Sequence, residues 1–338
     1  MTSAPFALFR CDASPLIGAG HATRCLALAE ALGEGGWRVR FAVGSETIPT
    51  VPALAASRFN VRVLGDADHE PEVLCEEASG EVDLLVIDHY KRDAAFERAC
   101  RKFARKILVL DDGPGQRHDC DILVNAAATS MELYAGYVPS HTRVLTGPAY
   151  ALMRRSFAAH RETALARRDG RPVKEILVSC GATDPANATM LVLDSLDDVA
   201  DDVIITVVLS SRAPHVDAVR ERLRGKARLL IDVADMAELM TNVDLAVGAP
   251  GSTAYERAVL GLPSILVTLA DNQRGIARLM IGAGAAVDGG MLDDEFTTRL
   301  RDRIGALVRS GEVRKRLAQC ASALIDGCGV SRVVEAVL

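Results

Sequence analysis

The segment spanning residues 10–30 holds the side chains whose types and spacing have the clearest chemical meaning. It reads RCDASPLIGAGHATRCLALAE, and it follows an apolar run at residues 6–9. Apolar residues then recur at helical spacing from Leu26 to Leu32. A glycine-containing loop between a strand and a helix is where open α/β sheets place ligands. Histidine is the side chain best suited to acid–base chemistry near neutral pH, so His21 is the candidate general base.

The residues around His21 fit a ligand-binding turn. Gly18 and Gly20 allow a tight turn and a close approach of the backbone to a ligand. His21 would begin the following helix, whose positive end favours the neutral imidazole that accepts a proton. Thr23 stands where a dinucleotide fingerprint would have its third glycine, so that motif is not met. The alternative is a histidine that only caps the helix. The segment also offers polar side chains for a substrate, namely Asp12, Ser14 and Arg24.

Two further polar segments follow apolar runs in the first half of the chain. Asp88 and Tyr90 come after residues 84–87, where the carboxylate could orient a histidine or bind a sugar hydroxyl and the phenol could donate a hydrogen bond. The alternative is an ordinary polar loop. Asp111 and Asp112 follow residues 107–110. Such a carboxylate pair could bind Mg²⁺, although it more often forms a turn.

The second half of the chain contains a candidate anion site at a helix start. Gly251, Ser252 and Thr253 follow an apolar run and open a helix that continues to Leu260. Free backbone N–H groups and two hydroxyls at a helix N-terminus suit a diphosphate. Glu256 lies one turn further and could accept hydrogen bonds from a ribose diol. The alternative is a serine or threonine cap with a first-turn glutamate.

Two other loops in the second half are candidates for substrate contacts. Residues 179–184, which include Gly181, follow a strand and could contact phosphate; a structural turn is the alternative. There Asp184 and Pro185 predict a helix cap followed by the first helical residue. Asn272 and Gln273 follow the strand at residues 264–267 and could read polar sugar substituents, although Asn272 could equally cap a helix.

The elements that would position these residues form two βα series. Near-continuous apolar runs separated by amphipathic stretches, such as residues 22–32 and 93–103, indicate parallel sheets covered on both faces. We expect an N-terminal lobe at residues 1–152, a helical connector at 153–172 and a C-terminal lobe at 173–338, as two Rossmann-like lobes facing across a cleft. One sheet of about twelve strands would exceed the usual limit of ~10. The predicted strands are residues 6–9, 38–43, 61–64, 84–87, 107–110 and 122–124, then 175–179, 204–209, 228–231, 245–247, 264–267 and 285–287.

Composition narrows the class of protein. A net charge of −6 argues against a nucleic-acid partner. The eight cysteines include no C-x-x-C pair, which favours reduced thiols over disulfides or zinc. The start of the chain lacks a signal-peptide pattern, and we find no apolar stretch of 18 residues. We therefore expect a cytoplasmic protein without a membrane partner. A monomer is also expected, although composition leaves the oligomeric state open.

Taken together, these motifs resemble the UDP-sugar hydrolases of pseudaminic acid biosynthesis, over nearly the whole chain. These enzymes remove UDP from UDP-2,4-diacetamido-2,4,6-trideoxy-β-L-altropyranose. More distantly, the chain is similar to the lipid II-forming UDP-GlcNAc glycosyltransferase, which has the two-lobe GT-B architecture. The resemblance rests on the pattern Arg10-x-Asp12-x-Ser14-x-x-Ile17-Gly18-x-Gly20-His21-x-x-Arg24, on Asp88-x-Tyr90, on Gly147-x-x-Tyr150-x-Leu152-x-Arg154, and on Gly251-Ser252-Thr253-x-x-Glu256 with Asn272-Gln273.

The resemblance implies a GT-B fold and an inverting, metal-independent hydrolase without a cofactor, serving flagellin or surface-glycan glycosylation. It implies that His21 activates the water that attacks the anomeric carbon, with Asp12 and Tyr90 as further catalytic residues. It places uracil near residues 233–236, which include Val233 and Met236, ribose on Glu256 and diphosphate on residues 251–253. The loop around Gly181 departs from the family, which more often has a second glycine there. A glycosyltransferase of the same fold and a non-catalytic nucleotide-sugar-binding protein remain alternative functions.

Overall fold

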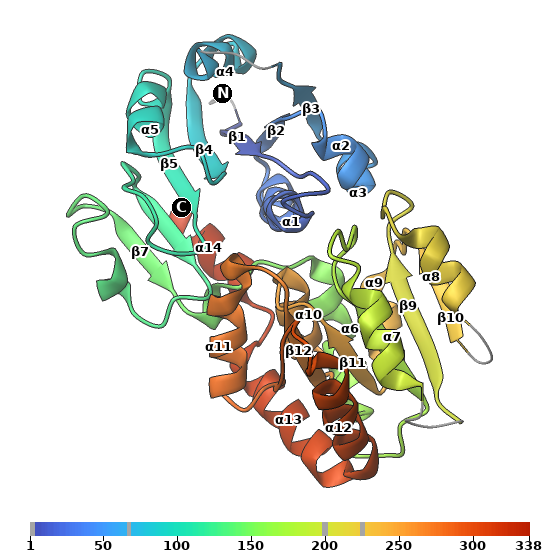
Figure 1. Ribbon diagram of the computed structural model, residues 1–338. Coiled ribbons are helices and arrows are strands. Elements are labelled where there is room, and N and C mark those ends of the chain that lie inside the picture. The colour runs from blue at the N-terminus through green and yellow to red at the C-terminus, as the bar shows by residue number, and fades with distance from the viewer. Residues whose placement is uncertain (1–3, 66–68, 198–201, 224–226) are drawn as a thin grey trace. The chain divides into compact units, whose positions relative to one another are not determined.

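The computed structural model describes residues 4–65, 69–197, 202–223 and 227–338, and it divides into two compact units (Figure 1). The first unit comprises Met1–Arg154 with Cys328–Leu338, and the second comprises Arg155–Gly327. Each unit is built on its own parallel β-sheet. The prediction of two Rossmann-like sheets, in place of one large sheet, is therefore confirmed.

The first unit contains a seven-stranded sheet in the order β3-β2-β1-β4-β5-β6-β7. Its pairs are parallel, and β1 lies between β2 and β4 with Cys11 opposite Asp88. Residues 38–43 match their prediction residue for residue, whereas β7 had no predicted counterpart. The strands are β1 (Phe6–Cys11), β2 (Arg38–Val43), β3 (Asn60–Val63), β4 (Val82–Asp88), β5 (Ala104–Leu110), β6 (Ile122–Asn125) and β7 (Arg143–Thr146).

Helices cover both faces of this sheet. Side chains that alternate along β1 enter two separate cores: Phe9 packs with residues of the first and last helices, whereas Leu8 packs with residues of the fourth and fifth. Phe9 stacks on Phe41 of β2, with ring centroids 4.9 Å apart. The helices are α1 (Gly20–Glu34), α2 (Thr47–Thr50), α3 (Pro52–Ala55), α4 (Glu70–Ala78), α5 (Ala94–Cys100) and α14 (Gly329–Val337), with short 3-10 turns η1 (Met131–Tyr134) and η2 (Pro148–Tyr150).

The last helix corrects the predicted domain boundary. The sequence interpretation assigned residues 173–338 to the C-terminal lobe, but α14 belongs to the first unit. Val333 and Val337 are buried in the core that α1 also covers, and Lys106 Nζ of β5 donates to the carbonyl of Val337 at 2.7 Å. The connector also differs from its prediction, because its helix α6 is part of the second unit.

The second unit contains a six-stranded parallel sheet in the order β10-β9-β8-β11-β12-β13. Its strands at residues 175–179 and 204–209 match the prediction residue for residue. The expected strand at 285–287 instead begins at its last residue and runs to Met291. The strands are β8 (Glu175–Ser179), β9 (Ile204–Leu209), β10 (Ala227–Ile231), β11 (Leu245–Gly248), β12 (Ser264–Thr268) and β13 (Val287–Met291).

The helices of the second unit bury the same kinds of apolar face. Val192 of α7 and Leu300 of α12 share one core with the inward residues of β8 and β11. The helices are α6 (Arg155–Ala166), α7 (Ala188–Leu196), α8 (Val216–Arg222), α9 (Met236–Asn242), α10 (Ser252–Val259), α11 (Arg274–Gly282), α12 (Phe296–Arg309) and α13 (Gly311–Leu324), with the 3-10 turn η3 (Asp271–Gln273).

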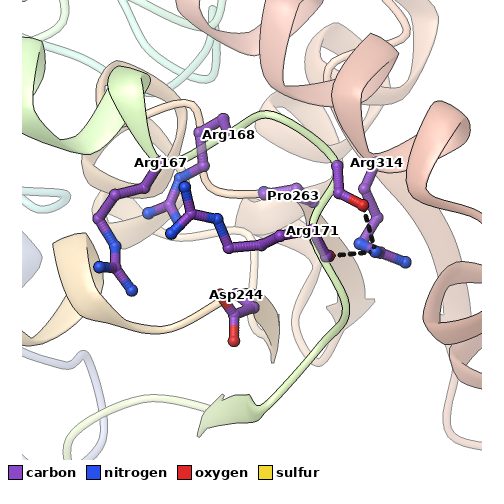
Figure 2. Close-up of a pocket in the computed structure, with 7 residues that line it drawn as sticks. Arg167, Arg168, Arg171, Asp244, Pro263 and Arg314 are labelled. Atoms are coloured by element: carbon purple, nitrogen blue, oxygen red, sulfur yellow. Dashed lines mark hydrogen bonds between the residues drawn. The ribbon is translucent and has the colours of Figure 1, made fainter.

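A group of arginines, Arg167, Arg168, Arg171 and Arg314, lines a small pocket in the second unit (Figure 2). All three guanidinium nitrogens of Arg168 donate to backbone carbonyls, among them Val243 at 2.6 Å and Met240 at 2.7 Å. Arg314 donates to the carbonyls of Val308 and Gly170. The last carbonyls of a helix lack partners within it, and cations near that end are favourable. The arginines of this small pocket therefore have a structural role, which is to stabilise the backbone of the unit.

All eight cysteines are free, and five of them are buried. Across the described ranges, we find no helix with both the length and the apolar character needed to cross a membrane.

Strand order identifies where each sheet would bind a ligand. The chain direction across the sheet reverses between β1 and β4 in the first unit, and between β8 and β11 in the second. In open α/β sheets, ligands bind beyond the carboxyl ends of the strands at such a switch point. The loops that follow these four strands contain most of the candidate residues.

Candidate active site

His21 lies at the switch point of the first sheet, in the first turn of α1. The preceding loop turns back on itself: Gly18 adopts a positive φ of 81°, and its N–H donates to the carbonyl of Ser14 at 2.8 Å. Ser14 Oγ in turn accepts from Ile17 N at 3.2 Å. The N-cap of α1 is Ala19, so His21 is not the cap. The His21 side chain is only 6% exposed, so its surroundings restrict its orientation.

Two carboxylates from neighbouring strand ends flank the His21 ring. Nδ1 lies 3.3 Å from Oδ1 of Asp88, which ends β4, and Nε2 lies 3.6 Å from Oδ2 of Asp112, which follows β5. Tyr90 packs edge-on against the imidazole, with centroids 4.5 Å apart, and its hydroxyl donates to Asp112 at 2.8 Å. The structure therefore brings His21, Asp88 and Tyr90 together.

Arg24 connects the same two carboxylates. Its Nε and Nη2 atoms each lie 2.7 Å from an oxygen of Asp88, and Nη1 lies 2.6 Å from Asp112. Arg24 sits one turn after His21 on α1, so both side chains reach the same strand ends. A bidentate contact of this kind fixes the carboxylate plane. Arg24 thus holds Asp88 and Asp112 in place for the imidazole.

The electrostatics of His21 differ from the sequence expectation. The helix N-terminus was expected to favour the neutral ring. Burial does lower the pKa of His21, but the carboxylates of Asp88 and Asp112 outweigh it, so the pKa is raised above its ordinary value. The same contacts hold the pKa of Asp112 well below its usual range, because Arg24 and His21 more than offset its burial. The site therefore stabilises an imidazolium next to an ionised carboxylate.

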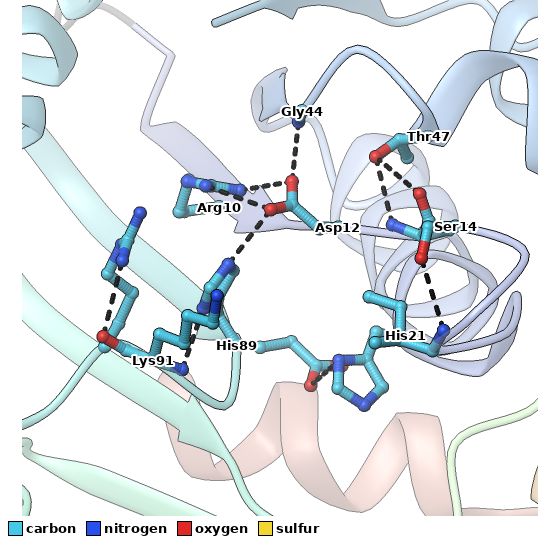
Figure 3. A network of polar contacts seen from close by, with 12 residues as sticks. Arg10, Asp12, Ser14, His21, Gly44, Thr47, His89 and Lys91 are labelled. Atoms are coloured by element: carbon cyan, nitrogen blue, oxygen red, sulfur yellow. Dashed lines mark hydrogen bonds and ion pairs between the residues drawn. The ribbon is translucent and has the colours of Figure 1, made fainter. Parts of the chain in front are cut away.

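Asp12 belongs to a different network from His21 (Figure 3). Its Oδ1 atom accepts from Arg10 and from the Gly44 N–H, both at 2.5 Å, and its Oδ2 atom lies 2.9 Å from Nε2 of His89. Although burial alone would raise the pKa of Asp12, the bonds from His89 and Arg10 hold it well below its usual range. Both oxygens are thus occupied, and Asp12 is an ionised anchor in this structure.

His89 is a site residue that sequence reasoning missed. Its Nδ1 accepts from the Lys91 N–H at 3.0 Å, so Nε2 carries the proton that faces Asp12. The ring therefore links the loop after β4 to the loop after β1. Its position directly after the carboxyl end of β4 was the available signal, because ligands bind at such strand ends.

A buried cation extends the Asp12 network inward. Arg10 also donates to Glu70 of α4 at 2.7 Å, and Arg92 donates to the same carboxylate at 3.0 Å. Arg10 is 3% exposed, so its paired carboxylates are needed to compensate for a buried charge. The cluster ties β1, α4 and the loop after β4 into one rigid base for the site.

Asp111 and Asp112, the two carboxylates considered as a Mg²⁺ site, both accept hydrogen bonds from other side chains. Asp112 is bound by Arg24 and Tyr90, whereas Asp111 accepts from the Tyr134 hydroxyl at 2.6 Å. Burial raises the pKa of Asp111. Within the residues that are described, no group of three or more His, Cys, Asp or Glu side chains is arranged to hold a metal ion.

In the second unit, the start of α10 forms the candidate anion site at the second switch point. Gly251 is the N-cap and has no side chain with which to satisfy the first N–H groups of the helix, so the alternative of a serine or threonine cap does not apply at this end. Ser252 and Thr253 are the first two helical residues. Glu256 lies one turn further and is 5% exposed. The backbone donors of this turn are those that an anion would need.

The loop after β8 lies beside that helix start. Ala249 N donates to the carbonyl of Ser179 at 3.2 Å, which joins the two loops. Gly181 adopts a φ of 115°, a conformation that favours glycine. The N-cap of α7 is Asn187 and not Asp184 as predicted, although the Asp184 side chain does accept from Ala188 N and Thr189 N of the first turn, at 3.0 and 2.8 Å. Pro185 is not the first helical residue as predicted, because a turn through Asn187 at positive φ delays the start of α7.

The remaining candidates lie on other loops of the same unit. Val233 follows β10 at the sheet edge, and Met236 is the first residue of α9. Gln273 Oε1 accepts from Leu269 N at 2.9 Å, so this oxygen stabilises the loop after β12. Asn272 lies beside it in η3. The N-cap of α11 is Gln273, so Asn272 does not cap that helix. Substrate contacts for these residues stay predictions.

Comparisons with known proteins agree with the resemblance inferred from the motifs. The spore coat polysaccharide biosynthesis protein SpsG of Bacillus subtilis is 28% identical over 323 residues, which cover 94% of this chain and 93% of that protein. A UDP-2,4-diacetamido-2,4,6-trideoxy-beta-L-altropyranose hydrolase of Campylobacter jejuni is 28% identical over 288 residues, which cover 83% of this chain and 98% of the hydrolase. No family model matches the chain.

Among solved structures, MurG of Acinetobacter baumannii is similar with a TM-score of 0.63 and 15% identity, covering 98% of this chain and 99% of MurG. At that identity the likeness establishes the fold. The expected GT-B fold is therefore confirmed, and it agrees with the more distant resemblance to the lipid II-forming transferase.

Proposed function

We propose that this protein hydrolyses a UDP-linked diacetamido-trideoxy hexose to UDP and the free sugar. The observation that carries the proposal is the setting of His21, a buried imidazole held between Asp88 and Asp112 at the switch point of the first sheet. The similarity to a hydrolase of UDP-2,4-diacetamido-2,4,6-trideoxy-beta-L-altropyranose supports this substrate class.

In the proposed reaction, His21 is the general base. Asp88 orients the ring through Nδ1–H, which leaves Nε2 to accept a proton from water. The oxygen of that water forms a bond to the anomeric carbon, and the bond between this carbon and the UDP oxygen breaks. UDP leaves with the electron pair, and the sugar configuration inverts. Asp112, 3.6 Å from Nε2, stabilises the imidazolium that results.

The second unit supplies the nucleotide site in this proposal. The unsatisfied N–H groups at the start of α10 bind the diphosphate and favour its negative charge as the bond to the sugar breaks. Glu256 binds the ribose hydroxyls, and the loop at residues 233–236 binds uracil. Asn272 and Gln273 contact the sugar substituents. Neither a metal nor a cofactor enters the scheme, and the protein acts as a monomer in the cytoplasm without a nucleic-acid partner.

The deciding experiment is NMR of the purified protein with a panel of UDP-diacetamido-trideoxy sugars and no acceptor. We expect free sugar and UDP to form in equal amounts at a catalytic rate, with the inverted anomer appearing first. In H₂¹⁸O, the label should enter the sugar and not UDP, because the bond to the anomeric carbon is the one that breaks. Label found in UDP would disprove the proposed attack.

A matched pair of variants tests the base. His21→Asn should retain UDP binding and lose turnover by about 10²–10⁴-fold, the usual contribution of a general base. His89→Asn alters a histidine of the neighbouring network and should cost less. Turnover of the His21 variant near the wild-type rate would exclude His21 as the base.

The same experiment separates the alternative functions. A glycosyltransferase, which the shared fold permits, would release UDP rapidly only when an acceptor is added. A binding protein would bind the UDP-sugar tightly and leave it intact after long incubation.

A further inference from the structure

Arg257 of α10 is a buried cation with incomplete pairing. The residue is 1% exposed, and Nη2 donates to the carbonyl of Ala249 at 2.8 Å. Neither Nε nor Nη1 has a hydrogen-bond partner in the described part of the chain. An uncompensated buried charge is strongly destabilising, so its presence calls for an explanation.

Two other buried arginines of the same unit have more hydrogen-bond partners than Arg257. Arg168 uses all three of its guanidinium nitrogens, bonding to four carbonyls at the far end of the sheet. Arg314 is likewise bound by four carbonyls. Backbone carbonyls at helix ends and in one loop thus accept the hydrogen bonds of Arg168 and Arg314, whereas Arg257 leaves two donors unused.

The position of Arg257 relates it to the anion site. A Cβ atom built on Gly248 would lie 2.8 Å from Nη1 and would clash with the Ser179 carbonyl. The guanidinium thus lies directly against the ends of β8 and β11. Its one bond, to Ala249, holds the segment that leads through Pro250 to the N-cap Gly251. The positive charge of Arg257 therefore lies on the buried side of the loops that follow β8 and β11.

Nearby side chains do not provide the missing negative charge. Cys180 is 3% exposed, and burial raises the pKa of its thiol, so it stays neutral. Glu256 is adjacent in sequence, but successive residues of a helix do not face each other. Its carboxylate does raise the pKa of Arg257, yet burial prevails and lowers that pKa to about 10. The guanidinium is charged at neutral pH.

We propose that Arg257 is a positioning residue for a diphosphate at the N-terminus of α10. It fixes the loop from Ala249 to Gly251, and its buried positive charge attracts the negative charge of phosphates that bind on the other side of this loop. The inference rests on the proposed function for the identity of the nucleotide. It goes beyond that function in assigning a role to a residue outside the predicted contacts.

The test compares the binding of uridine, UMP and UDP to the full chain by calorimetry. Arg257→Met should weaken UDP binding on the order of tenfold or more, UMP binding by less, and uridine binding hardly at all, because the effect is electrostatic. Arg257→Lys should recover part of the UDP affinity. The melting temperature of the Met variant should stay near wild type or rise, because an unpaired buried charge is removed.

Arg168→Met is the matched control. It removes another buried arginine from the same unit, and it should lower the melting temperature while leaving the ratio of UDP to uridine affinity unchanged. Equal losses for uridine and UDP in Arg257→Met, or no loss for UDP, would overturn the proposal for Arg257 alone.

Pyrophosphate as a second probe separates this inference from the proposed function. Binding of pyrophosphate that weakens in Arg257→Met, without preference for UDP over other nucleoside diphosphates, would support Arg257 and reject the UDP assignment. Failure of the wild type to bind either UDP or pyrophosphate would reject both.

Discussion

Nε2 of His21 lies 3.6 Å from Oδ2 of Asp112, although 91 residues of chain separate them. The relationship arises because α1 begins above the end of β1, and Asp112 follows β5 in the same sheet. The Asp112 charge favours the protonated ring, so it governs the pH at which His21 becomes a base.

The first prediction concerns the pH dependence of turnover. The pKa of His21 is raised, and a base must be unprotonated, so activity should rise with pH through a value above the ordinary histidine pKa of about 6.5. Asp112→Asn removes one source of the raised pKa and should move this acid limb of kcat/KM to lower pH. The measurement is kcat/KM against pH for both proteins.

Tyr90→Phe provides the control for that measurement. It removes the hydroxyl that donates to Asp112 at 2.8 Å but leaves the carboxylate charge in place. The acid limb should therefore move less than in Asp112→Asn. Equal positions of the limb in the wild type and Asp112→Asn would show that Asp112 does not control the His21 proton.

A second prediction concerns the stability that Arg24 provides. Arg24→Met would leave Asp88, which is fully buried, and Asp112 without their shared cation. Removing one partner of a buried pair costs about 3–5 kcal/mol, and we expect a loss of that order in the free energy of unfolding. Urea denaturation followed by circular dichroism measures it.

Arg105 offers the matched surface control for Arg24. It pairs with Glu81 at 2.6 Å, but both side chains are well over half exposed. Exposed pairs contribute little, so Arg105→Met should leave the urea midpoint nearly unchanged. Similar effects of the two substitutions would contradict the distinction between the buried and the surface pair.

Much of the fold follows from local sequence, because buried parallel strands are continuous apolar runs. The runs that became β2, β8 and β9 were found residue for residue for this reason. The edge strand β7 was missed, because Arg143–Thr146 is short and only one of its four residues is buried. The return of α14 to the first unit was also missed, since only tertiary packing selects the sheet that a terminal helix covers.

Less of the site could be predicted, because it depends on which strand ends are neighbours. The types and loops of His21, Asp88 and Tyr90 were recognisable. Which carboxylate would face which histidine was not recognisable. Asp12 pairs with His89, whereas Asp112 faces His21. That choice depends on the strand order and on side-chain rotamers. The burial of Arg257 could not be predicted either, because a charged residue on a helix is usually exposed.

A third prediction concerns the close approach of β8 and β11. Gly248 pairs with Ser179, and a Cβ there would clash with the Ser179 carbonyl and crowd Arg257. Gly248→Ala should therefore lower the free energy of unfolding by about 1–3 kcal/mol. Gly282→Ala is the control, since that glycine ends α11 with open space around it and alanine favours helix. Urea midpoints that rank the two variants the other way would exclude the steric cause.

The last prediction concerns the buried pair of His118 and Glu97. Nδ1 of His118 lies 2.6 Å from Oε1 of Glu97, and both side chains are nearly inaccessible. Burial lowers the pKa of His118, but the Glu97 carboxylate outweighs it and raises the pKa above its ordinary value. A pKa raised by folding stabilises the protein fully below the unfolded value of about 6.5, and this contribution is lost as pH rises through the folded pKa.

His118→Asn should therefore cost more stability at about pH 5.5 than at about pH 8.5, as measured by urea denaturation at both values. Glu97→Gln removes the carboxylate that raises the pKa, so the same histidine substitution made in that background should lose most of its dependence on pH. A cost of His118→Asn that is equal at the two pH values in the native background would mean that folding does not raise the pKa of His118. A cost that grows with pH would mean that folding lowers the pKa of His118, because the neutral ring would then be the form that the folded state favours.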